Sequence, residues 1–143
     1  MIAKVLLVDD EVPFVEALSK RLDKRGVAVI SAFSGQEALN KLAGDSSIDS
    51  VVLDVKMPGM DGIDTLKAIK AAYPLVEVVM LTGHATVESA IEGMRLGALD
   101  YLMKPCDMDV LLTKIQDAKQ KKNKHEEKIA EARAMNIALR RGD

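Results

Sequence analysis

The sequence is poor in cysteine, proline and aromatic residues. Its 143 residues include one cysteine, Cys106, four prolines, two tyrosines, two phenylalanines and no tryptophan. A single cysteine excludes an internal disulfide bond and is typical of a chain in a reducing compartment. The hydrophobic share of 48% and the charged share of 29% indicate one globular domain with a sizeable core.

The chain also lacks a long apolar run and an excess of charge of either sign. No stretch approaches the ~20 apolar residues that cross a bilayer, and the first four residues lead straight into an expected strand rather than a signal peptide. The formal net charge is −2, so no basic face dominates. We therefore expect a cytoplasmic protein that neither binds nucleic acid by itself nor enters a membrane.

What the sequence does contain is a regular alternation of short apolar runs and amphipathic segments. The apolar runs are rich in β-branched residues, which is typical of strands buried on both faces. The segments between them begin at capping residues such as Ser34, Asp61, Thr86 and Asp107, as helices do. Five such pairs predict an α/β fold with a parallel sheet and helices on both faces. The expected strands are residues 4–8, 27–30, 51–54, 78–81 and 98–103.

Four of the apolar runs end in polar side chains. Asp9 and Asp10 follow the first run, Asp54 ends the third, and Thr82 and Lys104 follow the fourth and fifth. In parallel α/β sheets, ligands bind outside the carboxyl ends of the strands, at the switch in strand order. We therefore expect these five side chains to meet at one rim of the sheet.

The three carboxylates at this rim predict a metal site. Asp9, Asp10 and Asp54 would repel one another, and a hard divalent cation removes that penalty. Oxygen ligands alone favour Mg²⁺, with Mn²⁺ as an alternative. The backbone carbonyl of Lys56 is a further candidate ligand.

The remaining groups at the rim suit phosphoryl transfer. Lys104 offers an ammonium and Thr82 a hydroxyl, and together with a metal ion they can neutralise the oxygens of a phosphoryl group. The one nucleophile at the centre is the carboxylate of Asp54, and carboxylates can attack phosphorus to give an acyl phosphate. The residues therefore predict an aspartyl-phosphate site at Asp54.

The same residues carry a family resemblance. The motifs are Asp9-Asp10-Glu11, Asp54, Met57-Pro58-Gly59-Met60-Asp61-Gly62, Thr82-Gly83 and Asp100-Tyr101-Leu102-Met103-Lys104-Pro105. In this order, over roughly residues 2–120, they resemble the receiver domain of two-component response regulators. The resemblance implies the flavodoxin-like strand order 2-1-3-4-5, with a receiver domain at 1–120 and an extension at 121–143.

The resemblance also implies roles for individual residues. A histidine kinase would phosphorylate Asp54, with Mg²⁺ held by the acid pair Asp9 and Asp10. Lys104 would contact the phosphoryl group, and the peptide bond after it is commonly cis in the family. Thr82 and Tyr101 would act as the switch that changes protein contacts. Details of the motifs most resemble receivers of the nitrogen-regulator type, which control σ54-dependent transcription through output domains absent from this chain.

Two residues beyond the phosphorylation motifs form a further hypothesis. Lys56 and His84 stand two residues after Asp54 and Thr82, so both are expected to flank the phosphoryl group. There they would tune how readily water reaches the acyl phosphate. The alternative is that they are two solvated loop residues.

The extension, residues 121–143, continues a final helix with a weak heptad pattern. This pattern predicts either a helix that pairs with a second copy of the chain or a solvated helix that begins a linker. The two lines of the heptad are Ile115, Lys122, Ile129 and Asn136, and Ala118, His125, Ala132 and Leu139.

Other functions fit parts of the pattern. The chain could be a stand-alone receiver or a phosphorelay intermediate. A phosphatase or phosphotransferase with an aspartyl-phosphate intermediate generally needs a second acid near the nucleophile, often two residues later, where this chain has Lys56. A flavin-binding module of the same strand order would need a phosphate-cradling loop where the acids of residues 9–11 stand. We therefore expect a signalling domain rather than an enzyme.

Overall fold

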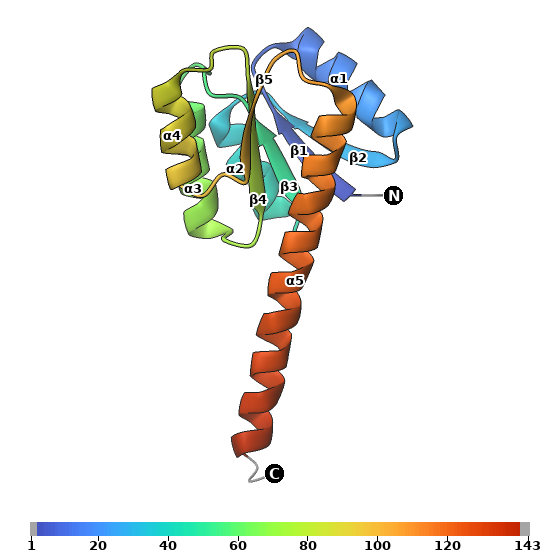
Figure 1. Ribbon diagram of the computed structural model, residues 1–143, viewed down its shortest axis with the longest axis vertical. Coiled ribbons are helices and arrows are strands. Elements are labelled where there is room, and N and C mark those ends of the chain that lie inside the picture. Colours follow the sequence, from blue (N-terminus) through green and yellow to red (C-terminus); the bar gives the residue numbers. More distant parts are fainter. Residues whose placement is uncertain (1–2, 141–143) are drawn as a thin grey trace.

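A computed structural model of the chain describes residues 3–140 and contains one parallel sheet of five strands (Figure 1). The strand order is β2-β1-β3-β4-β5. This confirms the predicted fold class and strand order. The strands are β1 (Ala3–Val8), β2 (Val27–Ala32), β3 (Ser50–Leu53), β4 (Glu77–Thr82) and β5 (Asp100–Met103).

Helices cover both faces of the sheet, as right-handed crossovers between parallel strands require. One face carries α1 and α5, and their apolar stripes pack on β1, β3 and β4. The other face carries α2, α3 and α4 (Figure 1). The helices are α1 (Val12–Lys24), α2 (Gly35–Gly44), α3 (Gly62–Ala72), α4 (Val87–Arg95) and α5 (Met108–Arg140).

The capping residues begin the helices at the predicted places. The Ser34 side chain accepts a hydrogen bond from the Glu37 amide, while the Glu37 carboxylate accepts one from the Phe33 amide rather than from Ser34 itself. Thr86 and Ser89 form a complete reciprocal capping box at α4. These caps satisfy amide groups that a helix start otherwise leaves without partners.

Two strand boundaries differ from the sequence prediction by two residues, and the others differ by at most one. The second strand runs on to Ala32 because Ala32 pairs with Val8 of β1. The fifth begins at Asp100 rather than at residue 98 because the Ala98 amide bonds back to the Gly93 carbonyl at the end of α4. The turn there passes through Gly97 at φ 102°, a conformation that suits glycine.

The register of the strands brings their carboxyl ends level. Val8 pairs with Leu53, so the residues that follow, Asp9 and Asp54, leave the sheet side by side. On the other side, Thr82 pairs with Met103, and Lys104 comes next. The four strand ends therefore open onto one rim.

The last helix is far longer than the sheet that it covers. Its first part is buried against the domain through apolar residues that end at Ala118, followed by the aliphatic stem of Lys122. Beyond Lys122 the helix projects away from the domain (Figure 1), for roughly 25 Å at 1.5 Å per residue. No break in the helix marks the predicted boundary at residue 120, and that boundary stays a prediction. Residues 141–143 of the predicted extension lie outside the described residues.

The heptad lines of this helix are not equally accessible. Ile115 and Ala118 are fully buried in the domain, and Lys122 is 8% exposed. These positions are occupied within the chain, so a second helix has access only to the later part of the pattern. Pairing of two chains through this helix stays a prediction. No helix within residues 3–140 has both the length and the apolar character needed to cross a membrane.

Lys122 anchors the projecting helix to the amino-terminal rim of the sheet. Its ammonium donates a hydrogen bond of 2.8 Å to the Ile48 carbonyl and lies 3.8 Å from a carboxylate oxygen of Asp49. We expect Lys122→Met, which keeps most of the stem, to lower the free energy of unfolding by about 1–2 kcal/mol, because a buried carbonyl loses its donor. Urea denaturation measures this, with the exposed Lys124→Met as control. Equal midpoints for the two variants would contradict the anchor.

Candidate functional site

Three of the predicted side chains are buried together at the carboxyl rim of the sheet. Asp9 is 1% exposed, Asp54 is 2% exposed and Thr82 is fully buried. Charged side chains are rarely buried to this degree without partners. The partners of these carboxylates therefore decide what the site can do.

Lys104 brings a positive charge to the acids at this rim. Its ammonium donates a hydrogen bond of 2.6 Å to a carboxylate oxygen of Asp9 and lies 3.7 Å from a carboxylate oxygen of Glu11. The Lys104 side chain is 14% exposed, so water screens this pair little. The peptide bond between Lys104 and Pro105 is cis, as the family resemblance implied.

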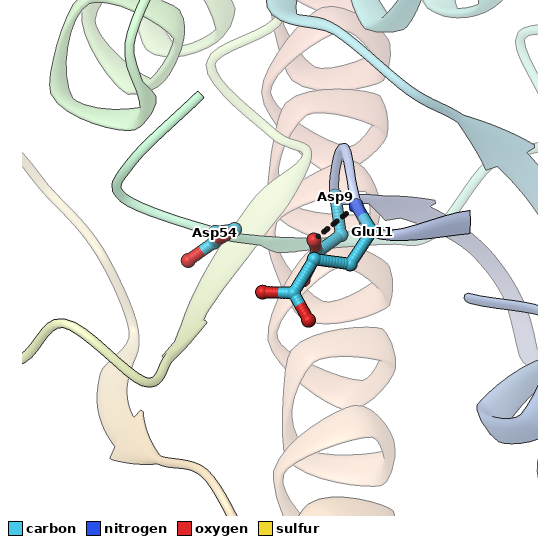
Figure 2. Close-up of side chains that lie close together, drawn as sticks. All are labelled: Asp9, Glu11 and Asp54. Atoms are coloured by element: carbon cyan, nitrogen blue, oxygen red, sulfur yellow. Dashed lines mark hydrogen bonds between the residues drawn. The ribbon is translucent and has the colours of Figure 1, made fainter. Parts of the chain in front are cut away.

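The acids at the rim form a cluster that differs from the predicted set. One carboxylate oxygen from each of Asp9, Glu11 and Asp54 lies within 4.8 Å of the others (Figure 2). Glu11 bends back to Asp9 because its amide donates a hydrogen bond of 2.9 Å to the Asp9 carboxylate. Asp10, predicted as a ligand, is exposed and lies outside this cluster. Its role as a ligand stays a prediction.

The cluster has the chemistry that a hard divalent cation needs. Three carboxylate oxygens from Asp9, Glu11 and Asp54 can reach one ion, and oxygen is the donor that Mg²⁺ prefers. Sequence reasoning did not assign a role to Glu11. The available signal was its position two residues after Asp9, where an aspartate at a strand end often accepts a hydrogen bond from the backbone two residues on.

The ionisation of Asp54 is disfavoured in the folded protein. Burial raises the pKa of its carboxyl above the ordinary value of 3.8, and the nearby Asp9 carboxylate raises it further. The Thr82 hydroxyl, the Lys104 ammonium and the Val55 amide oppose this rise without cancelling it. An ionised Asp54 is therefore short of positive charge, which an added cation would supply.

The segment after β3 holds Asp54 by its backbone. The Asp54 amide donates to the Val8 carbonyl at 3.0 Å, and the Val55 amide donates to the Asp54 carboxylate at 2.8 Å. The Gly62 amide then ties the start of α3 to the Val55 carbonyl at 2.7 Å. The chain returns so closely that a Cβ on Gly62 would lie 2.0 Å from the Asp54 carbonyl oxygen.

Of the two predicted switch residues, Thr82 lies beside Asp54 and Tyr101 lies against α4. The Thr82 hydroxyl accepts a hydrogen bond of 3.0 Å from the His84 amide. Tyr101 is half-buried on β5, and its hydroxyl lies 2.6 Å from the Ser89 hydroxyl of α4. Its ring packs over Gly93, where a Cβ would be 3.5 Å away. The Tyr101 side chain thus connects β5 to α4 on the same side of the sheet as Thr82.

An open hollow of about 330 Å³ lies at the rim next to the acids. Lys56 and His84 are both on its wall, together with Asp10 and Glu11. The two residues therefore border the hollow beside the acids. Their effect on water access to a phosphoryl group stays a prediction.

Comparison with known proteins agrees with this geometry. A sequence model of the response regulator receiver domain family matches residues 5–116. The transcriptional regulatory protein ZraR of Escherichia coli K12 is 41% identical over 114 residues, which is 80% of this chain and 26% of ZraR. The chain thus spans about a quarter of the length of this curated relative.

Solved structures show the same fold. A response regulator receiver domain protein from Clostridium thermocellum has a TM-score of 0.80 and 37% identity, covering 85% of this chain and 97% of that one. NtrX from Brucella abortus, solved in complex with ADP, has a TM-score of 0.79 and 29% identity. That match covers 100% of this chain and 30% of NtrX.

Proposed function

Because this chain belongs to the response regulator receiver domain family, we propose that Asp54 is its phosphoryl acceptor and a histidine kinase its phosphoryl donor. The observation that carries the proposal is the convergence of three strand ends on one buried carboxylate. Asp54 lies with Asp9 and Glu11, and the Lys104 ammonium is bound to the same group of acids.

The proposed transfer is a single displacement at phosphorus. A carboxylate oxygen of Asp54 attacks the phosphorus of a phosphohistidine, so a P–O bond forms while the P–N bond breaks. The electron pair of the P–N bond remains on the imidazole nitrogen. Lys104 supplies positive charge to the phosphoryl oxygens, where charge gathers during the transfer.

The reaction also needs positive charge between the carboxylates and the phosphoryl group, and Mg²⁺ can supply it. Asp9, Glu11 and Asp54 would hold the ion. Asp10 and Lys56, of which the carboxylate and the backbone carbonyl are the other predicted ligands, line the adjoining hollow. When bound, Mg²⁺ supplies charge that offsets the repulsion between the carboxylates and the phosphoryl group. The raised pKa of Asp54 supports this role, because burial and the Asp9 carboxylate disfavour its ionised form and a bound cation would favour it.

The consequence of phosphorylation is a change in protein contacts. We propose that a phosphoryl group on Asp54 attracts the Thr82 hydroxyl, which the His84 amide now contacts. Tyr101 would follow by leaving its contact with Ser89. Relatives such as ZraR are named transcriptional regulators, so control of transcription through an output domain is the expected result. On this proposal the chain is a signalling domain rather than an enzyme that turns over a substrate.

We expect the protein to accept one phosphoryl group from a small donor in the presence of Mg²⁺. Phosphoramidate contains a P–N bond like that of phosphohistidine. Transfer of its phosphoryl group to Asp54 would release ammonia. Intact-mass spectrometry should show a gain of about 80 Da in Mg²⁺ and none after chelation. A gain that persists in chelator, or no gain in either condition, would contradict the proposal.

Removing one acid is expected to weaken the metal site selectively. Asp9→Asn should weaken Mg²⁺ binding at least about tenfold, because it removes the carboxylate of the cluster that also accepts a hydrogen bond from Lys104. Titration calorimetry measures this. The Mg²⁺ affinities of Glu11→Gln and Asp10→Asn are then compared. Glu11 is the acid that the structure brings into the cluster, and Asp10 is the ligand that the sequence predicted. An unchanged affinity in Asp9→Asn would exclude this site for the ion.

A further inference from the structure

The Lys104 ammonium has a neighbour that neither the motifs nor the acid cluster accounts for. Its nitrogen lies 3.9 Å from the centre of the Phe14 ring. Phe14 stands in the first turn of α1, and the two residues border one small cavity of about 90 Å³ with Leu81 and Leu111. The ring thus faces the ammonium from the apolar side of the site.

This contact differs in kind from the ion pair with Asp9. An aromatic face attracts a cation through its quadrupole, and a distance of 3.9 Å is well within the range of about 6 Å for that attraction. The ring accepts no conventional hydrogen bond from the ammonium. The N–H groups that do not bind Asp9 therefore remain available for the oxygens of a phosphoryl group.

The contact also limits where the lysine can go. A lysine stem is flexible and its head is strongly hydrated, so an ammonium at a rim is drawn towards water. Here the ammonium is held between the Phe14 ring and the carboxylates of Asp9 and Glu11. Among residues 3–140, removing the ring would leave the carboxylates of Asp9 and Glu11 to hold the ammonium at the site.

We propose that Phe14 is a positioning residue for phosphoryl transfer, which keeps the Lys104 ammonium at the acceptor site through a cation–π contact. The proposal rests on the proposed function, because the ammonium is useful at this point only if a phosphoryl group arrives there. Phe14 itself need not touch the phosphoryl group. It acts by raising the fraction of molecules in which Lys104 is in place.

A series of fluorinated phenylalanines at position 14 tests this role. Successive fluorine atoms weaken the negative face of the ring while they change its size little, so packing and cation binding are separated. We expect the rate of phosphorylation by phosphoramidate to fall in steps along the series. Phe14→Leu should be slowed about fivefold and Phe14→Tyr should keep most of the wild-type rate.

The chain offers a matched control in its other phenylalanine. Phe33 is half-buried against the same core cluster as Phe14. The Lys104 ammonium lies over the ring of Phe14 and not over that of Phe33. Phe33→Leu therefore removes an aromatic ring of the same kind, and its rate should equal that of the wild type. A rate that is constant along the fluorinated series would overturn the proposal, even if Phe14→Leu is slow through lost packing.

A second measurement needs no phosphoryl group. In wild-type protein the ring current of Phe14 should shift the NMR signals of the Lys104 ε-methylene upfield, and Phe14→Leu should abolish that shift. Absence of the shift in wild-type protein overturns the contact itself. If wild-type protein shows the shift but accepts no phosphoryl group, the proposed function fails while the contact stands.

Discussion

Asp54→Asn is expected to abolish phosphoryl uptake completely while the protein stays folded. Asparagine has nearly the same shape as aspartate but offers no carboxylate to attack phosphorus. The intact mass should not change with phosphoramidate and Mg²⁺, whereas the control Asp23→Asn, at an exposed position of α1, should gain about 80 Da like the wild type. Full uptake by the Asp54 variant would assign the acceptor to another residue.

The same variant should be more stable than the wild type at neutral pH. The pKa of Asp54 is raised above the unfolded value of 3.8, so folding favours its protonated form. The cost of keeping Asp54 ionised is absent well below pH 3.8 and is fully present above the raised pKa. Asparagine removes that cost, for an expected gain of about 1–2 kcal/mol, or roughly 2–6 °C in Tm.

Thermal melts over a range of pH in chelator measure this gain. The difference between variant and wild type should shrink as pH falls through the raised pKa of Asp54 and vanish below the unfolded value. Adding Mg²⁺ should also shrink the difference, because the ion stabilises the wild type by binding its carboxylates. A difference that is constant with pH would mean that burial of the Asp54 charge does not limit stability.

Gly62→Ala is expected to cause the largest loss of stability among these variants. The new Cβ would lie 2.0 Å from the Asp54 carbonyl oxygen and 2.6 Å from the Val55 Cα, and both neighbours are backbone atoms. A side chain could turn aside, but these atoms can move only if the end of β3 moves. We expect a loss of at least about 3 kcal/mol in urea denaturation, together with slower phosphoryl uptake, because Asp54 itself is displaced.

Gly44→Ala is the matched control for this prediction. Gly44 ends α2 at an exposed position, and beyond its chain neighbours and its own helix backbone a Cβ there would meet no described atom within 4 Å. The substitution should be neutral or stabilise by up to about 1 kcal/mol, because alanine has the higher helix propensity. If both variants lose stability equally, the close approach at Gly62 is not the cause.

Much of the site could be predicted because its residues follow directly from strand ends. To predict that Asp54 and Thr82 belong to the site, only the positions of the apolar runs were needed, together with the rule that ligands bind at the carboxyl ends of parallel strands. Glu11 was missed because its position depends on a hydrogen bond from its own amide to Asp9, which turns the chain back towards the acids. Asp10, one residue earlier, is exposed like Glu11, but it lies outside the cluster that Glu11 joins.

Strand boundaries and long-range contacts were harder to predict, because they too depend on particular hydrogen bonds that a sequence pattern does not show. The start of β5 depends on an amide of Ala98 that bonds to α4 instead of to the sheet. The role of Lys122 depends on the Ile48 carbonyl, 74 positions earlier in the chain. A periodic pattern places Lys122 on the inner line of a helix, but it does not predict that a backbone carbonyl accepts a hydrogen bond from its ammonium.

The sequence by itself determined the alternation of strands and helices and the polar residues at the ends of four of the five strands. Those features are local, because periodicity and capping depend on residues a few positions apart. Only the tertiary structure decided which acids form the cluster with Asp54 and that Phe14 faces Lys104. Lys104 and Asp9 are 95 positions apart, and their 2.6 Å contact exists only because β1 and β5 end at the same rim of one sheet.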